Sequence, residues 1–158
     1  MSGVHPRPQS PSFAMRPQSQ VVESARVMRI VIMGCGRVGA HLANTLHRDH
    51  EITIIDRSPI AFERLSPDFS GRTVLGAGDD PDVLVQAGIR EADVYCALTN
   101  RDNTNIMGSE MARELFHVPR VITRIYDYDR EDTYHHLGLE TICPTRESVR
   151  ILEAMLTT

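Results

Sequence analysis

The sequence predicts an α/β protein with one doubly wound, parallel sheet of six strands in a single domain. From Met28 onward, short β-branched runs alternate with longer stretches of helical spacing. The runs are apolar on both faces, as is typical of strands buried under helices on each side. A glycine-rich turn directly follows the first run. Together these features indicate a Rossmann-like architecture.

Six runs are expected to form strands. In chain order they are Arg29–Met33, Ile52–Asp56, Arg72–Leu75, Asp93–Thr99, Val121–Ile125 and Glu140–Cys143. Stretches with helical spacing separate them, such as 38–46 after the first strand and Asn103–Leu115 after the fourth. Right-handed crossovers between such units predict the strand order 3-2-1-4-5-6 within residues 28–158.

Residues 1–27 differ from the rest. Pro6, Pro8, Pro11 and Pro17 stand among Ser, Gln and Arg without apolar periodicity, so we expect a disordered tail. The tail lacks the apolar stretch of a secretory signal, although its Arg and Ser content leaves an organelle transit peptide open. The cytoplasm is therefore the expected location.

Composition excludes several classes of function. The 158 residues are 41% apolar and 24% charged, which suits one globular core. The net charge of −4 argues against a nucleic-acid partner, and no apolar run approaches the roughly 20 residues needed to insert across a bilayer. All 17 basic residues are Arg, so Schiff-base chemistry and a P-loop lysine are excluded. The three widely spaced cysteines predict reduced thiols, without a disulfide framework or a CxxC metal site.

The strongest chemical signal is the string GCGRVG at residues 34–39, a GxGxxG motif between a strand and a helix. Gly34 makes the tight turn, Gly36 lets the backbone approach a pyrophosphate, and Gly39 allows close packing of helix on strand. The positive end of the following helix points toward the phosphates. The alternative is a glycine turn in a fold that has lost its ligand.

Asp56 strengthens this interpretation. It ends the second strand about 20 residues after the glycines, where a carboxylate accepts the hydroxyls of an adenosine ribose. Such a carboxylate repels a 2′-phosphate and favours NAD over NADP, although the adjacent Arg57 could bind that phosphate. Asp56 does not separate NAD from ATP, ADP or AMP, because all of them carry the same ribose.

Together with several further positions, these residues resemble the RCK N-terminal domain family, also called KTN or TrkA-N, of potassium channel and transporter regulatory subunits. The further positions are Gly78-Asp79, Ala87-Gly88-Ile89, Thr99 with Asp102-Asn103-Thr104-Asn105, and Arg124. The resemblance covers Met28 to the C-terminus. Two departures are that Asp80-Pro81 stands where the family often has a small residue and Thr, and that the smaller C-terminal ligand domain is missing.

The resemblance implies a regulatory subunit that senses NAD(H) or ATP/ADP and controls a membrane potassium transport system without chemistry on the ligand. Its expected partners are a membrane channel or transporter subunit and further copies of itself, at the inner face of the cell membrane. The nucleotide-binding residues would be Gly34, Cys35, Gly36, Arg37, Val38, Gly39, Asp56, Arg57, Gly78, Asp79, Thr99, Asn100 and Arg124.

Several of these residues could instead have purely structural roles. Thr99 and Asn100 could cap the helix that follows them, with Asp102 as a rival cap. Arg124 could pair with a carboxylate instead of a pyrophosphate, and Arg37 could be a solvated surface side chain. Two other functions also stay open: the cofactor domain of an NAD-dependent dehydrogenase, and an adenine-nucleotide module that regulates some other partner.

Other candidates favour structural roles. Neighbouring His135 and His136 point in different directions and are expected at the surface. The acidic stretch 127–132 suits a helix N-terminus, with a cation site as the alternative. Cys35 is either a small side chain in the variable slot of the turn or a thiolate activated for redox sensing. A helical stripe of Met107, Met111 and Leu115 is expected in the core.

A C-terminal helix, Arg146–Leu156, is apolar on two faces. We expect Val149, Leu152 and Met155 or Leu156 to pack on the protein's own sheet. The second face, with Ile151, Ala154 and Met155, would then be covered by another subunit.

Overall fold

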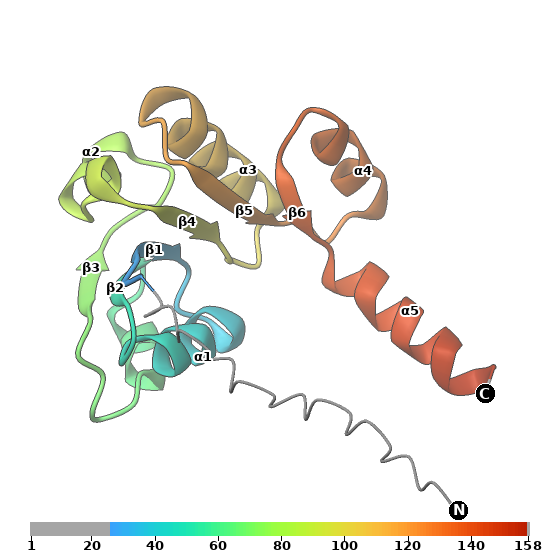
Figure 1. Cartoon of the computed structure of the whole chain (residues 1–158), viewed down its shortest axis with the longest axis horizontal. Coiled ribbons are helices and arrows are strands. Elements are labelled where there is room, and N and C mark those ends of the chain that lie inside the picture. The colour runs from blue at the N-terminus through green and yellow to red at the C-terminus, as the bar shows by residue number, and fades with distance from the viewer. Residues whose placement is uncertain (1–25, 158) are drawn as a thin grey trace, which may run out of the picture.

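The computed structural model describes residues 26–157, so the predicted tail lies outside the described residues except for residues 26 and 27. The chain forms six parallel strands in the order β3-β2-β1-β4-β5-β6, which confirms the predicted doubly wound sheet (Figure 1). The strands are β1 (Arg29–Met33), β2 (Glu51–Asp56), β3 (Arg72–Leu75), β4 (Val94–Ala97), β5 (Arg120–Arg124) and β6 (Glu140–Ile142). Central β1 pairs with β2 and β4, with Ile30 beside Ile52 on one side and Val94 on the other.

Helical segments connect the strands. They are α1 (Arg37–Leu46), the 3-10 segment η1 (Pro59–Arg64), α2 (Pro81–Gln86), the short η2 (Ile89–Glu91), α3 (Asp102–Glu110), the π-helical η3 (Met111–Leu115), α4 (Tyr128–His136) and α5 (Pro144–Leu156). Within residues 26–157 no helix is long and apolar enough to cross a bilayer.

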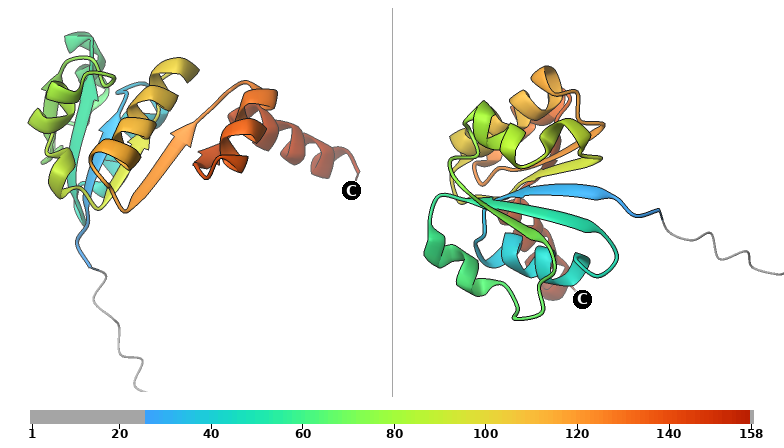
Figure 2. Two further views of the ribbon diagram at one scale, coloured as in Figure 1. Left: turned by 90° about the horizontal axis from the view of Figure 1, so that it is seen from above. Right: turned by 90° about the vertical axis from the view of Figure 1, so that its left-hand side faces the viewer.

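Two apolar clusters lie on the two faces of the sheet, because successive strand residues point to opposite sides. Ile30, Ile32 and Ile54 pack under α1 and η1 with Ala40 and Ala61. Val31, Met33 and Tyr95 belong to the other cluster, with Leu84 of α2 and Ala112 of η3. Figure 2 shows the helices on both sides of the sheet. The fold therefore has three layers.

The expected core stripe along Asn103–Leu115 is wrong. Met107 is 56% exposed and Leu115 57% exposed, whereas Met111 is partly buried against the core. The α-helix changes to π-helical geometry at Met111, so the apolar spacing of an uninterrupted helix does not continue through it. The buried face of α3 instead carries Thr104, Asn105, Ile106, Gly108 and Ser109.

The expected position of the C-terminal helix is also wrong. Helix α5 has no buried residue, and it projects from the end of β6 instead of folding back onto the sheet (Figure 1). Only Cys143 separates β6 from α5, and its extended backbone and the following Pro144 leave no reversing loop. Arg146 fixes the base of α5 by pairing with Glu131 of α4 at 2.7 Å and stacking over the Tyr128 ring at 4.1 Å.

Candidate nucleotide site

The glycine turn between β1 and α1 is constrained by close backbone contacts. Gly34 has φ +105° and donates its N–H to the Ile55 carbonyl at 2.8 Å. A Cβ on Gly34 would lie 2.9 Å from the Thr99 nitrogen, and a Cβ on Gly39 would overlap the Gly34 carbonyl oxygen. These two glycines are therefore required by the packing of β1, β4 and α1.

Gly36 differs from both. A Cβ there would meet no atom within 4 Å, and the backbone at φ −79° is open to any residue. Gly36 is the N-cap of α1, so no side chain accepts a hydrogen bond from the first helical N–H groups. The fold leaves open space directly in front of a positive helix end, which is where an anion binds best.

Asp56 lies at the carboxyl end of β2, where it accepts hydrogen bonds through both oxygens. Oδ2 accepts from the Cys35 N–H at 2.8 Å, and Oδ1 accepts from the Ser58 N–H at 2.9 Å. Each carboxylate oxygen has a second lone pair that these bonds leave available. Asp56 therefore ties the glycine turn to the end of β2, a role that sequence spacing did not reveal.

Across the crevice, buried Asn105 of α3 joins the ends of β4 and β5. Its side chain donates to the carbonyls of Thr99 at 2.9 Å and Arg124 at 2.8 Å, and its Oδ1 accepts from the Thr99 N–H and hydroxyl. Sequence reasoning named Asn105 only within the resemblance and missed this role. The apolar spacing of this helix predicted a different buried stripe, so no local signal marked Asn105 as buried.

Arg124 is 7% exposed and has no carboxylate partner among residues 26–157. Its guanidinium donates to the Thr99 carbonyl at 2.9 Å and lies 4.9 Å from the centre of the Tyr126 ring. Burial lowers the pKa of Arg124 from its ordinary value, and the nearby Tyr126 and Asp102 offset this effect only in part. The expected alternative of a direct ion pair with a carboxylate is therefore not found among the described residues, although Asp102 acts on Arg124 at longer range.

The capping alternative for Thr99 and Asn100 is wrong as well. Helix α3 begins at Asp102, and its N-cap is Arg101. The Asp102 carboxylate does not cap the helix: it accepts from the N–H groups of Tyr126 at 2.9 Å and Asp127 at 3.1 Å, and so fixes the chain after β5.

These residues border two adjoining hollows at the carboxyl edge of the sheet, which share Asp56, Thr99 and Asn100. The larger has a volume of about 720 Å³ and is lined by the turn residues 34–38, Asp56, Thr99, Asn100 and Arg124, together with Arg64 and Tyr126, which sequence reasoning missed. The smaller, about 120 Å³, is lined by Asp56, Arg57 and Gly78 among others. Ligands of open α/β sheets bind at this edge, where the strand order reverses between β1 and β4.

Gly78 and Asp79 have different surroundings in the structure. A Cβ on Gly78 would overlap the Met33 side chain, so packing alone requires this glycine. Asp79 is exposed and lines neither hollow. The neighbouring Asp80 caps α2 by accepting from the Asp82 N–H at 2.9 Å, with Pro81 as the first helical residue, which explains the departure from the family pattern.

Four arginine side chains in the described part of the chain make no ion pair, hydrogen bond or ring contact: Arg37, Arg57, Arg64 and Arg101. All four line the two hollows. Arginines elsewhere on the surface pair readily, as Arg120 does with Glu140 at 2.6 Å. The crevice therefore collects unpaired positive charge in a chain of net charge −4.

Cys35 is not a redox-active thiolate. Its side chain is fully buried, and its Sγ donates to the Ala61 carbonyl at 3.3 Å. Burial, reinforced by the Asp56 carboxylate, raises the pKa of Cys35 to about 11, so the thiol stays protonated. The redox-sensing alternative is wrong, and Cys35 packs as a small core residue.

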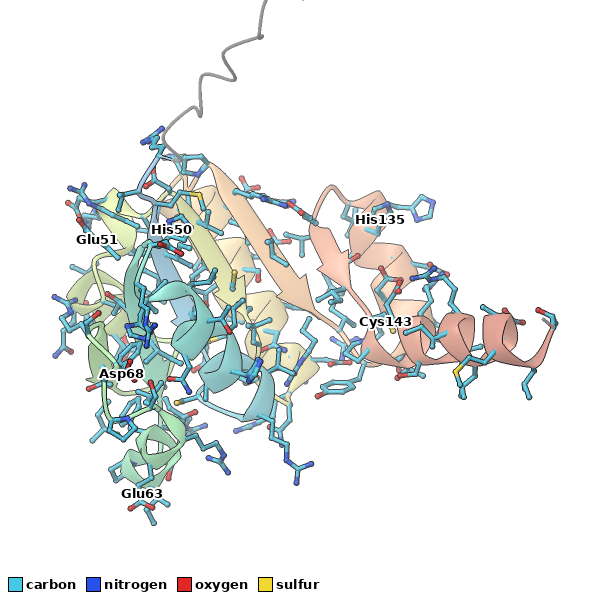
Figure 3. The ribbon with its side chains drawn as sticks, turned by 60° about the horizontal axis from the view of Figure 1, so that its bottom comes forward. His50, Glu51, Glu63, Asp68, His135 and Cys143 are labelled. Carbon is cyan, nitrogen blue, oxygen red and sulfur yellow. The ribbon has the colours of Figure 1, made fainter. Side chains whose placement is uncertain are left out.

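The remaining candidates have structural surroundings. Asp127 caps α4 by accepting from the Asp129 and Arg130 N–H groups, and Glu131 is buried against Arg146, so the acidic stretch is explained without a cation. No group of three or more His, Cys, Asp or Glu side chains in residues 26–157 is placed to hold a metal ion. His135 lies on α4, pointing away from the crevice (Figure 3).

A third hollow, about 660 Å³, lies at the opposite, amino-terminal edge of the sheet. Arg29 and Glu51 there pair with each other at 3.3 Å, and His47 is held by Ser70 at 3.0 Å. Several of its polar side chains are thus already partnered, in contrast to the arginines of the carboxyl edge.

Similarity to known proteins supports the fold and shows the family. The family model described as the TrkA-N domain matches residues 30–144. The Trk system potassium uptake protein TrkA of Streptomyces coelicolor is 48% identical over 120 residues, covering 75% of this chain and 54% of that protein. A TrkA homolog of Methanothermobacter thermautotrophicus is 33% identical over 132 residues, covering 82% and 61%.

Among solved structures, the GsuK channel bound to NAD is 28% identical, with a TM-score of 0.69 over 82% of this chain and 23% of that one. The TrkA-N domain of the Escherichia coli inner membrane protein ybaL has a TM-score of 0.71 at 20% identity, over 84% and 98%, which speaks for the fold alone. This chain spans between about half and three fifths of the two TrkA relatives. With a family match across most of its length and a relative close to half identical, the chain belongs to the TrkA-N domain family.

Proposed function

We propose that this protein binds an adenine nucleotide, NAD(H) or ATP/ADP, in the carboxyl-edge crevice and passes its occupancy to a membrane potassium transport system. The observation that carries the proposal is the open space at Gly36, between an uncapped helix end, the Asp56 carboxylate and the unpaired Arg124. Such a site fits a ligand with a ribose and a pyrophosphate, because it offers an acceptor for hydroxyls and donors for phosphate oxygens.

In this proposal each residue has a separate part. The free N–H groups at the start of α1 hold the pyrophosphate, and Arg124 supplies a positive charge that is in no ion pair with another described residue. Asp56 accepts the adenosine ribose hydroxyls through the lone pairs that Cys35 and Ser58 leave open. Thr99 and Asn100 border the far half of the crevice.

The function is that of a sensor. The relatives named for potassium uptake and the GsuK channel bound to NAD support a regulatory part in potassium transport. We place the protein in the cytoplasm, at the inner face of the membrane, with a channel or transporter subunit as its partner. When bound, the nucleotide supplies a signal through its occupancy, and no residue of this chain is assigned to chemistry on it.

Asp56 supports NAD over NADP, since its carboxylate repels a 2′-phosphate. Choice between NAD(H) and ATP/ADP depends on the far end of the ligand. Calorimetric titration with NAD, NADH, NADP, ATP, ADP and AMP tests the proposal. Binding of at least one adenine nucleotide that Asp56→Ala weakens is expected, and no binding of any of them would refute it.

The proposed regulation of potassium transport needs a second assay. Loss of potassium uptake on deletion of the gene, restored by the native protein but not by a variant that folds and does not bind nucleotide, is the expected result. Turnover of NADH with an added carbonyl substrate would instead favour the dehydrogenase alternative.

A further inference from the structure

One buried hydroxyl group in the crevice has no hydrogen-bond partner in the part of the chain that the structure describes. Thr104 lies in the first turn of α3, is 7% exposed and lines the smaller hollow. In other helices, Thr45 donates to the His41 carbonyl at 2.9 Å and Thr133 to the Asp129 carbonyl at 3.1 Å. Because a buried hydroxyl without a partner is costly, its place on a hollow indicates a partner outside this chain.

The start of α3 explains why the Thr104 hydroxyl stays free. Helical threonines donate to the carbonyl four residues earlier, and for Thr104 that residue is Asn100, which precedes the helix. The first hydrogen bond of α3 runs from the Asn105 N–H to the Arg101 carbonyl at 3.0 Å. The hydroxyl therefore has no helical carbonyl to reach, and it is available to a ligand in the smaller hollow.

The floor of the smaller hollow is apolar and fixed in position. Met33, Ile55, Gly76 and Gly78 contribute to it. The buried Met33 accepts a hydrogen bond from the Tyr95 hydroxyl at 3.3 Å through its sulfur, and it packs so closely on Gly78 that a Cβ there would overlap it. Such a floor suits a flat, largely apolar group, whereas a phosphate would lose its hydration there.

Two arginines form the walls of the smaller hollow. Arg57 follows β2 and Arg101 follows β4, and β1 lies between these two strands, so the arginines approach the hollow from opposite sides. Neither side chain has a partner within the described residues. Guanidinium groups stack on the faces of flat aromatic rings, including nucleobases. The walls, like the floor, are thus suited to a planar ring.

The arrangement of the two hollows gives the ligand a direction. Asp56 lines both, whereas Gly36 and Arg124 line only the larger and Thr104 only the smaller. A ribose bound at Asp56 with its phosphates at Gly36 would therefore carry its base toward the smaller hollow.

We propose that the smaller hollow holds the adenine base, with the Thr104 hydroxyl bonded to a polar group on the edge of the ring and Arg57 and Arg101 on its faces. This inference rests on the proposed function, which assigns the ribose and the phosphates but not the base. Thr104 is then a specificity-determining residue, because its hydroxyl bonds to only one polar position on the ring and favours bases that carry it.

Titration of ADP analogues into the native protein and Thr104→Val tests the contact. Four analogues each lack one polar group of adenine: 1-deaza-, 3-deaza- and 7-deaza-ADP lack a ring nitrogen, and purine riboside diphosphate lacks the amino group. Val keeps the branched shape and removes the hydroxyl, so Thr104→Val should bind ADP about three- to tenfold more weakly. One analogue should show a similar loss with the native protein and no further loss with Thr104→Val, because both changes remove the same hydrogen bond.

Thr123→Val is the matched control. The Thr123 hydroxyl is also buried, but it donates to the Ser109 hydroxyl at 2.7 Å. Thr123→Val should therefore lower the unfolding temperature and leave ADP affinity unchanged, whereas Thr104→Val should keep the native unfolding temperature because it breaks no bond within the described fold.

Arg101→Ala separates a contact to the base from a contact to phosphate. It should weaken the binding of adenosine and of ADP by the same factor, since both carry the base. A loss confined to ADP would mean that Arg101 holds a phosphate, and would overturn the proposal.

The titrations also distinguish failure of this inference from failure of the proposed function. Native ADP affinity in Thr104→Val, or losses for all four analogues that are the same in both proteins, would overturn the inference; weakened binding in Asp56→Ala would leave the proposed function standing. Absence of ADP binding would overturn the inference as well, and binding of NADH in that case would again leave the proposed function standing. Absence of binding of every adenine nucleotide would refute both.

Discussion

Replacing Gly36 by Ala should separate binding from folding. The backbone at φ −79° accepts an L residue, and a Cβ there meets no atom within 4 Å. Replacing Gly by Ala restricts the unfolded chain, which stabilises the folded state by about 0.4–1 kcal/mol. Ala is also a poorer N-cap than Gly, which destabilises the helix by about the same amount. We therefore expect an unfolding temperature within a few degrees of the native value, since about 1 kcal/mol corresponds to roughly 2–8 °C in domains of this size.

Nucleotide binding should nevertheless fall about a hundredfold or more, because the methyl group occupies the space in front of the α1 N–H groups where the phosphates would lie; that ratio corresponds to about 2.7 kcal/mol. Calorimetric titration with NADH and ATP measures the binding, and thermal unfolding measures the stability. Gly39→Ala is the matched control: its Cβ would overlap the Gly34 carbonyl oxygen, so it should lower stability by about 1–3 kcal/mol. Native affinity in folded Gly36→Ala would show that the phosphates lie elsewhere and refute the site.

Four further experiments test other parts of the site and core. Asp56→Ala removes hydrogen bonds to a charged acceptor, about 1.5–3 kcal/mol, so nucleotide affinity should fall about ten- to a hundredfold in a titration; an unchanged affinity would remove Asp56 from the site. Arg124→Gln should weaken binding of ADP more than that of adenosine, and equal losses for the two would contradict a phosphate contact. Burial raises the pKa values of Cys35 and Cys96 to about 11, and it also raises the pKa of Tyr95. A thiol in the unfolded chain ionises near pH 8.5, so the unfolded state binds fewer protons and denaturant-measured stability should fall from about pH 8.5 to 11; a flat profile there would contradict the burial. Cys35 should correspondingly resist alkylation at pH 8 until the protein unfolds, and rapid native labelling would contradict its assignment to the core.

Local patterns predicted the framework of the fold because each strand and turn carries its own signal. The glycines at 34–39 and Asp56 fixed the first β-α-β unit, and the alternation of apolar runs gave the strand order. Strand ends differ from the predicted ones by at most one residue, except that β4 stops at Ala97, two residues before the predicted end.

Features that depend on long-range contacts were not predictable in this way. Asn105 joins the ends of two strands from a third element, and nothing in its local sequence distinguishes it from a surface amide. The direction of α5 depends on a one-residue connection and on Arg146 reaching α4, whereas its periodicity reports only that it is amphipathic. Spacing alone likewise assigned Met107 to the core, but Asn105 and Ser109 lie on the buried side of α3 and Met107 is exposed.

The unpaired arginines at the crevice bear on the speed of the response as well as on its strength. An acidic protein repels an anionic nucleotide at long range, whereas a local cluster of positive charge attracts it at short range. At 0.1 M salt this attraction is largely screened beyond about 10 Å. The association rate should therefore fall as ionic strength rises, while the dissociation rate changes little. If the protein senses a nucleotide as proposed, it should follow rapid changes in nucleotide concentration best in dilute salt and more slowly at high salt.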